Sequence, residues 1–435
     1  MIPLLVDDVR RLAPGELRTT TTERVTGVEI DSRRIETGDL FVAVGRGSAY
    51  VDDALAAGAA AALVPEDAFS ALAALAREVR SHSAAKVVAV TGSTAKTSTK
   101  DILGALCAPH VRTVVAEGSQ NNEIGLPLTL CRLEPETEVA IVEMGMRGVG
   151  QIAELCEIAR PDIGIITTVG PVHLELLGTI ERVAEAKAEL IAALPSGGTA
   201  IVPAGQAALD PYLARDDIGI VRFGEGGEVT LSYFAARQGR SRLKVTAFGR
   251  PLTIEFSFSG RHNATNALAA LAAYNALGLP LGKAQRGARR VKLSRWRGEE
   301  APLPGDGVLI NDCYNANPLS MTAALEHLAE RAGARRKVAV LGDMAELGPG
   351  APSYHREVGA AASRAGVDVL VAVGPLARSY LDGARGVPVT RWSPTVDQAL
   401  AALRGLLQPG DCVLLKGSRA MGLEAIGEAL AVVPA

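Results

Sequence analysis

The sequence predicts an α/β protein of three domains, in which the second and third domains hold parallel β-sheets. Apolar runs of strand length recur along residues 84–435, and segments long enough for one helix separate them. Such alternation is typical of strand–helix–strand units, whose parallel strands are covered on both faces. The chain has 435 residues, which suits about two to four domains at roughly 150 residues each.

Residues 1–83 form the first predicted domain. They contain the strand-like VTGVEI at 25–30, the turn-rich DSRRIETGD at 31–39 and the strand LFVAV at 40–44. We expect an alanine-rich helix after these segments. The polar SHSAAK at 81–86 is predicted to be the linker to the next domain.

Residues 84–298 form the second predicted domain, which holds a parallel sheet. Its predicted strands are VVAVTG (87–92), VAIVEMG (139–145), IGIITTVG (163–170) and TAIVPA (199–204). Helices are expected at 97–107, 180–194 and 263–277, and a less regular β-rich stretch is expected at 218–258.

Residues 299–435 repeat the alternation in the third predicted domain. The apolar runs are GVLINDCY (307–314), KVAVLGDM (337–344), DVLVAVG (368–374), VPVTRW (387–392) and DCVLLKG (411–417). This pattern favours a doubly wound, Rossmann-like sheet, and the loop APLPGDG at 301–307 is predicted to mark its start.

The composition excludes several classes of function. A net charge of −3 gives no electrostatic argument for a nucleic-acid partner. The longest apolar stretch, residues 54–64, is mostly alanine and too short to span a bilayer. The N-terminus MIPLLVDDVRR lacks the order of a signal peptide, and the five cysteines show no paired spacing. We therefore expect a cytoplasmic protein without disulfides, zinc or a membrane span, with a monomer as the default.

Residues 86–98, KVVAVTGSTAKTS, carry the most informative motif. An apolar strand leads into a short Gly-containing loop, and Lys96, Thr97 and a helix-like segment follow. Backbone N–H groups at such a helix start bind phosphates, the lysine adds a charge, and the hydroxyl reaches Mg²⁺. The motif predicts a P-loop for a nucleoside triphosphate and a central sheet of the P-loop ATPase type. An ordinary turn with a surface lysine is the alternative.

The residue before this lysine is Ala95, where such loops usually carry glycine. Either the loop avoids positive φ at this position, or the site is compromised. We expect Ala95→Gly to preserve or raise ATP turnover.

Polar clusters follow several predicted strands, at the edge where open α/β sheets bind ligands. The run Asn121–Glu123 forms a polar loop, for which a capped turn is the simpler interpretation. Glu143 ends a buried strand, where a carboxylate could ligate Mg²⁺. His173 follows a third strand, although a lone histidine is more often structural. Spacing alone assigns Lys187 to a solvated helix face.

The third domain adds three more polar loops after strands, at 312–318, 342–348 and 416–419. Three such loops on one sheet edge are hard to explain as independent turns. Six basic side chains lie upstream at 286–297. Most of them are expected on a solvated face, and one or two near the domain junction could neutralise phosphate.

Taken in order, these motifs resemble the Mur ligases along essentially the whole chain. The matching stretches include DSRRIETGDLFVA (31–43), TGSTAKTSTK (91–100), NNEIGLPLTL (121–130), GPVHLE (170–175), GRHNATNALAA (260–270), YNANPLSM (314–321), GDMAELG (342–348) and KGSRAM (416–421). The YNANP and GDMAELG blocks are the specific ones, because sister ligases that add other amino acids carry different third-domain loops. The resemblance implies an ATP-dependent amide ligase of peptidoglycan precursor synthesis. It would join D-alanyl-D-alanine to UDP-N-acetylmuramoyl-tripeptide through an acyl phosphate.

The resemblance also implies a role for each domain and for individual residues. Residues 1–83 would bind the uridine nucleotide, residues 84–298 ATP, and residues 299–435 the incoming dipeptide. The implied ATP-binding residues are Thr91, Gly92, Ser93, Thr94, Ala95, Lys96, Thr97, Ser98, Asn263, Asn266, Arg295, Asp312 and Tyr314. The implied ligands of two Mg²⁺ ions are Thr97, Glu143, His173 and a carbamylated Lys187. The implied substrate-binding residues are Asp31, Ser32, Arg33, Asn121, Asn122, Glu123, Asn315, Asn317, Lys416 and Ser418. Lys96, His173, Lys187 and Arg295 make up the implied catalytic set.

Two alternatives to this function remain at the level of the sequence. One is a related ligase with another amine nucleophile, such as a folylpolyglutamate-type synthetase, although those enzymes lack a uridine-nucleotide domain. The other is a nucleotide-binding homologue that has lost catalysis, for which Ala95 is the main support. The sequence does not distinguish lysine from diaminopimelate as the third residue of the tripeptide.

Overall fold

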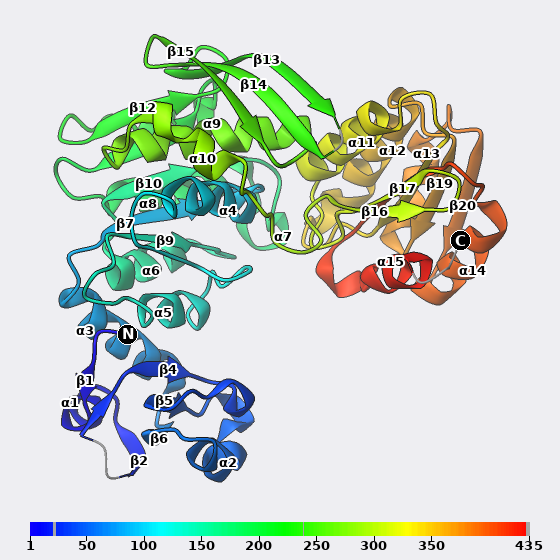
Figure 1. Ribbon diagram of the computed structural model, residues 1–435. Helices are drawn as coiled ribbons and strands as arrows, with labels where there is room; N and C mark the ends of the chain where they lie inside the picture. Colours follow the sequence, from blue (N-terminus) through cyan, green and yellow to red (C-terminus); the bar gives the residue numbers. More distant parts are fainter. Residues whose placement is uncertain (21–22, 238, 432–435) are drawn as a thin grey trace.

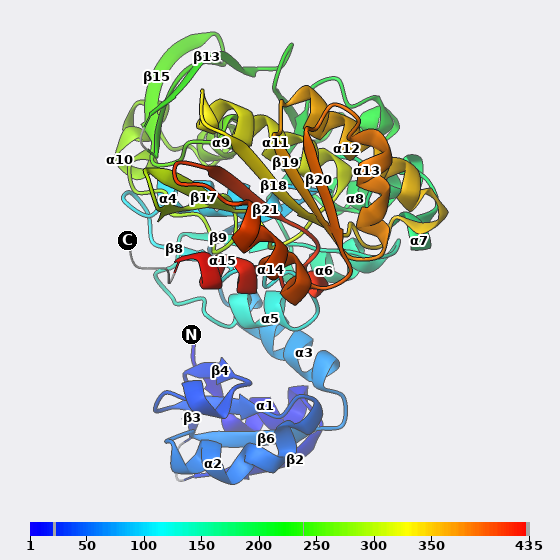
Figure 2. The ribbon, with the colours of Figure 1, turned by 90° about the vertical axis from the view of Figure 1, so that its right-hand side faces the viewer.

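A computed structural model describes residues 1–20, 23–237 and 239–431. Three larger sheets follow one another along the chain, and each lies in its own lobe of the molecule (Figure 1). Turning the molecule brings the C-terminal lobe in front of the central lobe, with the N-terminal lobe below both (Figure 2). The predicted three-domain α/β architecture is confirmed. No helix in the described part of the chain is both long and apolar enough to cross a membrane.

The N-terminal lobe is built on a four-stranded sheet with the order β2-β6-β5-β4. Its strands are β2 (Gly15–Thr19), β4 (Gly27–Glu29), β5 (Asp39–Val42) and β6 (Ala61–Pro65), and β1 (Leu4–Leu5) pairs separately with β3 (Arg24–Val25). Its helices are α1 (Val6–Leu12), α2 (Val51–Ala56) and α3 (Ala68–Ser81). The prediction of one alanine-rich helix after β5 is wrong in part, because α2 ends at Ala56 and the chain re-enters the sheet as β6. Pairing with both β5 and β2 supplies backbone hydrogen bonds and buries this run, which overrides its helix propensity.

Helix α3 connects the N-terminal lobe to the central one. The Asp67 carboxylate accepts hydrogen bonds from the first backbone N–H groups of α3. The helix packs against α5 (Gly125–Leu130) and α6 (Gln151–Ala159), and Arg80 Nε donates to the Ala159 carbonyl at 2.9 Å. One continuous hydrophobic cluster therefore spans both lobes.

The central sheet has nine strands in the order β15-β14-β13-β12-β11-β10-β7-β9-β8. Their bounds are β7 (Lys86–Thr91), β8 (Thr113–Val115), β9 (Val139–Glu143), β10 (Ile163–Ile166), β11 (Thr199–Pro203), β12 (Gly219–Phe223), β13 (Val229–Arg237), β14 (Arg240–Ala247) and β15 (Arg250–Phe256). The four predicted strands, β7, β9, β10 and β11, pair in parallel as predicted. The sequence analysis did not predict β8 and β12 as members of this parallel sheet, but they also pair in parallel, whereas β13, β14 and β15 form an antiparallel meander.

Helices cover both faces of the central sheet (Figure 1). Besides α5 and α6 they are α4 (Lys96–Cys107), α7 (Leu174–Leu177), α8 (Ile180–Ala192), α9 (Arg261–Ala276) and α10 (Gln285–Ala288). Alternate residues of β7 enter two different cores: Val87 and Ala89 pack with α6 and α8, and Val88 and Val90 pack with α4 and α9. Burial on both faces explains why the strand is apolar at successive positions.

The C-terminal sheet has six strands in the order β16-β17-β21-β18-β19-β20. Its strands are β16 (Glu299–Leu303), β17 (Gly307–Asn311), β18 (Lys337–Gly342), β19 (Val369–Val373), β20 (Val389–Ser393) and β21 (Cys412–Lys416). Its helices are α11 (Pro318–Ala332), α12 (Ala351–Arg364), α13 (Tyr380–Gly383), α14 (Val396–Leu406) and α15 (Glu424–Ala431). Short 3₁₀ helices occupy Ser32–Arg34, Gly45–Tyr50, Ala207–Tyr212, Leu281–Lys283, Gly348–Gly350, Leu376–Ser379 and Arg419–Met421.

Five of these strands are parallel, with α11 and α12 on one face and α14 and α15 on the other. The predicted doubly wound sheet is therefore confirmed. The predicted loop at 301–307 is wrong in part, because residues 301–303 belong to β16. That strand adds antiparallel to β17 at the sheet edge, which the proline-containing sequence conceals.

Candidate active site

The predicted P-loop connects β7 to α4. Gly92 has a φ of 146°, and a Cβ there would lie 1.9 Å from Thr167 Oγ1, so only glycine fits. The Lys96 ammonium donates to the Gly92 carbonyl at 2.9 Å and closes the loop. The backbone N–H groups at the start of α4 have no carbonyl partner within the helix, which is the usual anion-binding arrangement.

Ala95 takes the backbone conformation that glycine usually supplies. Its φ of 66° and ψ of 0° lie in the left-handed region, directly before the first residue of α4. An alanine in this region costs roughly 1–2 kcal/mol. The loop therefore does not avoid positive φ, and it reaches the glycine-type geometry despite the side chain.

A cavity of about 350 Å³ lies between the P-loop and the C-terminal lobe. From the central lobe it is lined by Ser93, Thr94, Ala95, Lys96, Thr97, Ser98, Asn121, Glu143, Thr168, His262, Thr265 and Asn266. From the segment before β16 and from the C-terminal lobe it is lined by Arg297, Asp312, Tyr314, Asn315, Asn317, Leu319, Ser320, Ala323 and Lys416. The cavity thus gathers polar loops that are far apart in the sequence, and its volume is typical of a small-molecule site.

Arg297, rather than Arg295, is the arginine that the structure brings to the P-loop. Arg297 Nη2 donates to Thr97 Oγ1 at 3.1 Å, and its guanidinium lies 4.1 Å from the Tyr314 ring centroid. Arg295 lies over the Trp296 ring, outside the cavity lining. Trp296 has a φ of 58°, which turns the chain between the two arginines. The sequence carries no signal for this turn.

Glu143 is the carboxylate of the cavity. Its side chain is buried, with 1% of the residue exposed. Oε1 accepts a hydrogen bond from Asn121 Nδ2 at 2.7 Å, while Oε2 has no partner among the described residues. A buried carboxylate oxygen left free beside a phosphate-type loop fits a Mg²⁺ ligand, since Mg²⁺ takes one or two carboxylates together with phosphate oxygens.

Two lysines lie behind the loop: Lys96 is half-buried and interacts with Glu143, and Lys187 is buried and interacts with Lys96. Burial lowers the pKa of Lys96; the nearby Arg297 lowers it further, whereas Glu143 raises it. Lys187 on α8 is only 2% exposed, so the expectation of a solvated helix face is wrong. Burial and then the charge of Lys96 lower the pKa of Lys187 well below its usual value. Its amine makes no hydrogen bond or ion pair within the described ranges, which favours the neutral form.

His173 lies at the boundary with the C-terminal lobe rather than in the cavity lining. Its Nδ1 contacts Glu346 Oε2, and burial lowers its pKa while Glu346 opposes that shift. The charges of Lys187 and Lys96 also lower the pKa of His173. His173, Glu346, Lys187 and Lys96 therefore lie close enough to interact electrostatically.

The other predicted ATP-binding residues have mixed positions. Asn266 lines the cavity and donates to Asn263 Oδ1 at 2.9 Å, which fixes the buried Asn263 amide behind it. The Thr91 hydroxyl donates to the Met144 carbonyl and supports the loop from below. Asp312 and Tyr314 both line the cavity, and Asp312 Oδ2 accepts from Lys416 Nζ at 2.6 Å.

The predicted substrate-binding residues fall into two groups. Asn121, Asn315, Asn317 and Lys416 line the cavity. Outside its lining lie Asn122, whose Oδ1 accepts from the Gly125 N–H, the exposed Glu123, and Ser418, whose Oγ accepts from the Ala345 N–H. Asp31, Ser32 and Arg33 lie in the N-terminal lobe, where Asp31 and Arg33 form an ion pair.

The sequence analysis missed several lining residues. Thr168 Oγ1 accepts from the Thr94 N–H at 3.1 Å, and the threonine pair that follows the apolar strand in IGIITTVG was a signal for it. His262 lies in the cavity wall beside the predicted asparagines. Burial lowers its pKa to about 4, and the His327 ring stands 5.6 Å away in the C-terminal lobe.

Side chains from both lobes meet around the cavity. Asn317 caps α11 and also donates to the Ser93 carbonyl of the P-loop at 3.2 Å. The Tyr314 hydroxyl contacts Ser119. The C-terminal lobe therefore contacts the P-loop directly, and Ser93 and Asn317 are buried at this contact.

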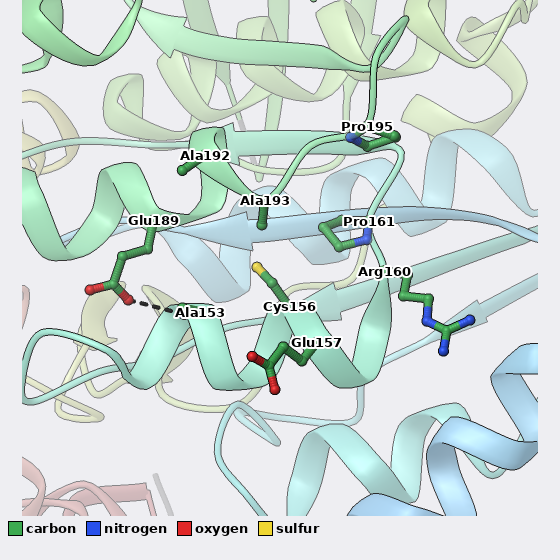
Figure 3. A pocket seen from close by; sticks show the side chains of 9 residues that line it. All are labelled: Ala153, Cys156, Glu157, Arg160, Pro161, Glu189, Ala192, Ala193 and Pro195. Carbon is green, nitrogen blue, oxygen red and sulfur yellow. Dashed lines mark hydrogen bonds between the residues drawn. The ribbon is translucent and has the colours of Figure 1, made fainter.

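A larger cleft of about 730 Å³ lies elsewhere, between α6 and α8 (Figure 3). Its lining is mostly small and apolar. Both carboxylate oxygens of Glu189 already accept backbone N–H groups at the start of α6, from Gly150 and Ala153. The smaller cavity at the P-loop, which gathers free polar groups, is therefore the candidate site.

Comparison with known proteins gives matches over most of the chain. Residues 90–274 match the family described as Mur ligase middle domain, and residues 297–419 match the one described as Mur ligase, glutamate ligase domain. A UDP-N-acetylmuramoyl-tripeptide–D-alanyl-D-alanine ligase from Synechocystis is 37% identical over 426 residues, covering 93% of this chain and 91% of the relative.

Solved structures agree with this similarity. MurF from Acinetobacter baumannii superposes with a TM-score of 0.87 at 29% identity and covers 99% of both chains. MurF from Thermotoga maritima, solved in complex with ADP, has a TM-score of 0.79 at 29% identity, covering 93% of this chain and 97% of that one.

Proposed function

The chain belongs to the Mur ligase family, and we propose that it joins D-alanyl-D-alanine to UDP-N-acetylmuramoyl-tripeptide, converting ATP to ADP and phosphate. The observation that carries the proposal is the single cavity shared by the P-loop and the YNANP loop. Relatives that match 93% and 99% of the chain bear the name of this ligase. In this proposal the enzyme is cytoplasmic and monomeric and acts in peptidoglycan precursor synthesis.

We assign the nucleotide to the P-loop side of the cavity. Residues 91–98, with Lys96 at their centre, would hold the phosphates, and Asn263 and Asn266 would hold the adenine. Arg297 takes the position near the phosphates for which the sequence suggested Arg295, since it contacts Thr97 directly. Asp312 and Tyr314 would close the site from the C-terminal lobe.

Thr97, Glu143 and His173 are the proposed metal-binding residues, and Mg²⁺ when bound would neutralise charge on the phosphate oxygens. The free Oε2 of Glu143 supports this assignment. We further propose that Lys187 is carbamylated and helps to hold a second ion. A neutral buried amine can attack CO₂, forming an N–C bond and losing a proton, and its lowered pKa favours the neutral amine.

The proposed reaction has two displacements. The terminal carboxylate of the tripeptide attacks the γ-phosphorus, the bond to ADP breaks, and an acyl phosphate forms. The amine of D-alanyl-D-alanine then attacks the acyl carbon, phosphate leaves, and the amine gives up a proton. Lys96 and Arg297 would stabilise the charge on the transferred group, while the contacts between the lobes position the reactants.

The remaining substrates would approach from the two outer domains. We propose that residues 1–83 bind the uridine nucleotide through Asp31, Ser32 and Arg33, and that residues 299–435 bind the dipeptide. Asn315, Asn317, Lys416 and Ser418 are proposed for the dipeptide side. Asn121, Asn122 and Glu123 are proposed for the tripeptide.

ADP release tests the proposal when measured with UDP-N-acetylmuramoyl-tripeptide, ATP, Mg²⁺ and D-alanyl-D-alanine, leaving out one component at a time. We expect full release only with all four. Release that is indifferent to the dipeptide would indicate another amine nucleophile. Bound ATP without any ADP release would indicate a homologue that has lost catalysis.

A further inference from the structure

The segment that joins the central and C-terminal lobes is attached to the P-loop helix at two points. The backbone N–H and the hydroxyl of Ser294 both donate to Asp101 Oδ2, each at 2.8 Å. Three residues later, Arg297 Nη2 donates to Thr97 Oγ1 at 3.1 Å. Thr97 and Asp101 stand four residues apart on α4 and thus share one face of the helix. Residues 294–297, called the strap below, therefore lie along the first turns of α4.

The Asp101 carboxylate is itself held in place. Lys100 Nζ donates to Asp101 Oδ1 and to the Ala116 carbonyl, both at 2.6 Å. The side chains of Lys100 and Asp101 are only 2% and 9% exposed. Charge-assisted hydrogen bonds in such a buried setting are short and strong. Asp101 is therefore a fixed anchor for the strap.

The strap changes partners along its length. Ser294 is bound to the central lobe, whereas the Trp296 ring lies 4.4 Å from the Arg419 guanidinium of the C-terminal lobe. Arg297 contacts Thr97 on one side and the Tyr314 ring on the other. A movement of the C-terminal lobe would therefore act on the strap between Trp296 and Arg297, and Asp101 holds the strap upstream of that point.

We propose that Asp101 is a positioning residue, which clamps Ser294 so that Arg297 stays at the P-loop when the C-terminal lobe moves. Asp101 is not among the residues that line the cavity, so in this proposal it acts only through the strap. This inference rests on the proposed function, in which Arg297 stabilises charge on the transferred phosphoryl group. Displacing a positioned group by about 1 Å can lower a rate by as much as ~100-fold, so a carboxylate two steps removed from the chemistry can matter.

The test is a double-mutant cycle with Arg297. We expect Asp101→Asn to lower kcat/KM for ATP about tenfold in the wild-type background, and less than about twofold when Arg297→Ala is already present. Equal losses in the two backgrounds would overturn the proposal, because Asp101 would then act independently of Arg297. So would a variant that folds and keeps the wild-type kcat/KM.

Asp101→Asn leaves the Lys100 charge poorly compensated, so a second variant is needed in case the protein fails to fold. Ser294→Ala removes one of the two strap bonds and leaves the ion pair intact, and we expect it to show the same dependence on Arg297. Ser259→Ala is the matched control. Its hydroxyl donates to Glu300 Oε1 at 2.7 Å, another hydroxyl–carboxylate bond between segments flanking the strap, but without a link to Arg297. A loss with Ser259→Ala as large as that with Ser294→Ala would also overturn the proposal.

A second measurement follows the strap without any turnover. The chain has two tryptophans, so Trp392→Phe leaves Trp296 as the only reporter. We expect the fast component of its fluorescence anisotropy decay to grow in Asp101→Asn and Ser294→Ala, but not in Ser259→Ala. An unchanged decay in both strap variants would contradict the clamp. If the wild-type protein releases no ADP but the two strap variants still show the larger fast component, the proposed function is contradicted and the clamp is not.

Discussion

Glu346 of the C-terminal lobe contacts Nδ1 of His173 in the central lobe. Its second oxygen lies 3.6 Å from Arg147 Nε, and its carbonyl accepts the Glu175 N–H. A carboxylate that accepts from one nitrogen of a histidine leaves the other nitrogen unprotonated, which is the arrangement that orients a metal-binding histidine. His173 is therefore oriented by a residue from the opposite lobe.

We expect Glu346→Gln to lower the rate of ADP release roughly 10–100-fold and to raise the Mg²⁺ concentration needed for half-maximal rate. The substitution removes the charge that holds His173. A Mg²⁺ titration of ADP release measures both effects. Glu175→Gln is the control, since the side chain of Glu175 is exposed and only its backbone meets Glu346. Equal effects of the two substitutions would argue against this orientation.

Ala95→Gly is expected to preserve or raise ATP turnover, because glycine removes the left-handed strain at φ 66°. The relieved strain and the greater freedom of glycine in the unfolded chain nearly cancel, so the free energy of unfolding should change by less than about 1 kcal/mol. Ala95→Val should destabilise the loop and lower turnover, since a branched side chain fits this conformation less well than alanine. ADP release and thermal unfolding of the three proteins measure both effects. Lower turnover with glycine would show that the loop depends on the alanine.

Lys187→Met is expected to abolish most ADP release and to stabilise the fold at neutral pH in bicarbonate-free buffer. The folded-state pKa of Lys187 lies below its usual value of 10.5, so the unfolded chain binds the additional proton. Stability contributed by this residue therefore rises as pH increases toward 10.5. Melting temperatures between pH 7.5 and 9.5 should rise less in the variant than in the wild type. Parallel curves would show that Lys187 is charged or carbamylated in the folded protein.

Acid should weaken the contact between the two lobes through His262. Burial lowers its folded-state pKa from 6.5 to about 4, so the unfolded chain binds the proton first. Stability is then lost as pH falls from 6.5 toward 4, by about 3 kcal/mol at most for this residue. His327 and Lys416 add to the effect, and Asp312 opposes it. We expect the melting temperature of His262→Gln to fall less between pH 7 and pH 5 than that of the wild type. An identical fall in both proteins would assign the acid sensitivity to other groups.

The P-loop and the strands around it were predictable because their signals are local. A buried parallel strand must be apolar at successive positions, and the loop after it must carry Gly92 and Lys96 at fixed spacing. The N-terminal lobe was harder. Residues 61–65 have the composition of a helix and form β6, because two neighbouring strands supply hydrogen bonds that no local property reveals.

The site was predicted where each residue type has one evident use, as for Glu143 at a strand end. It was missed where the backbone changes direction. Arg295 and Arg297 are the same residue type two positions apart, so the sequence does not distinguish them. The left-handed backbone at Trp296 decides which of them contacts Thr97. A residue such as Asp101 gives no signal at all, since an acidic residue on a helix is ordinarily solvated.

The sequence by itself determined the α/β class, the phosphate-binding loop and the order of the polar loops, because these depend on residues close together in the chain. Only the tertiary structure decided which polar side chains share the cavity, that Lys187 is buried, and that Glu346 meets His173. Those relationships join segments more than a hundred residues apart or depend on burial. They arise from packing the two lobes against each other, which fixes distances and local charge that no short stretch of sequence encodes.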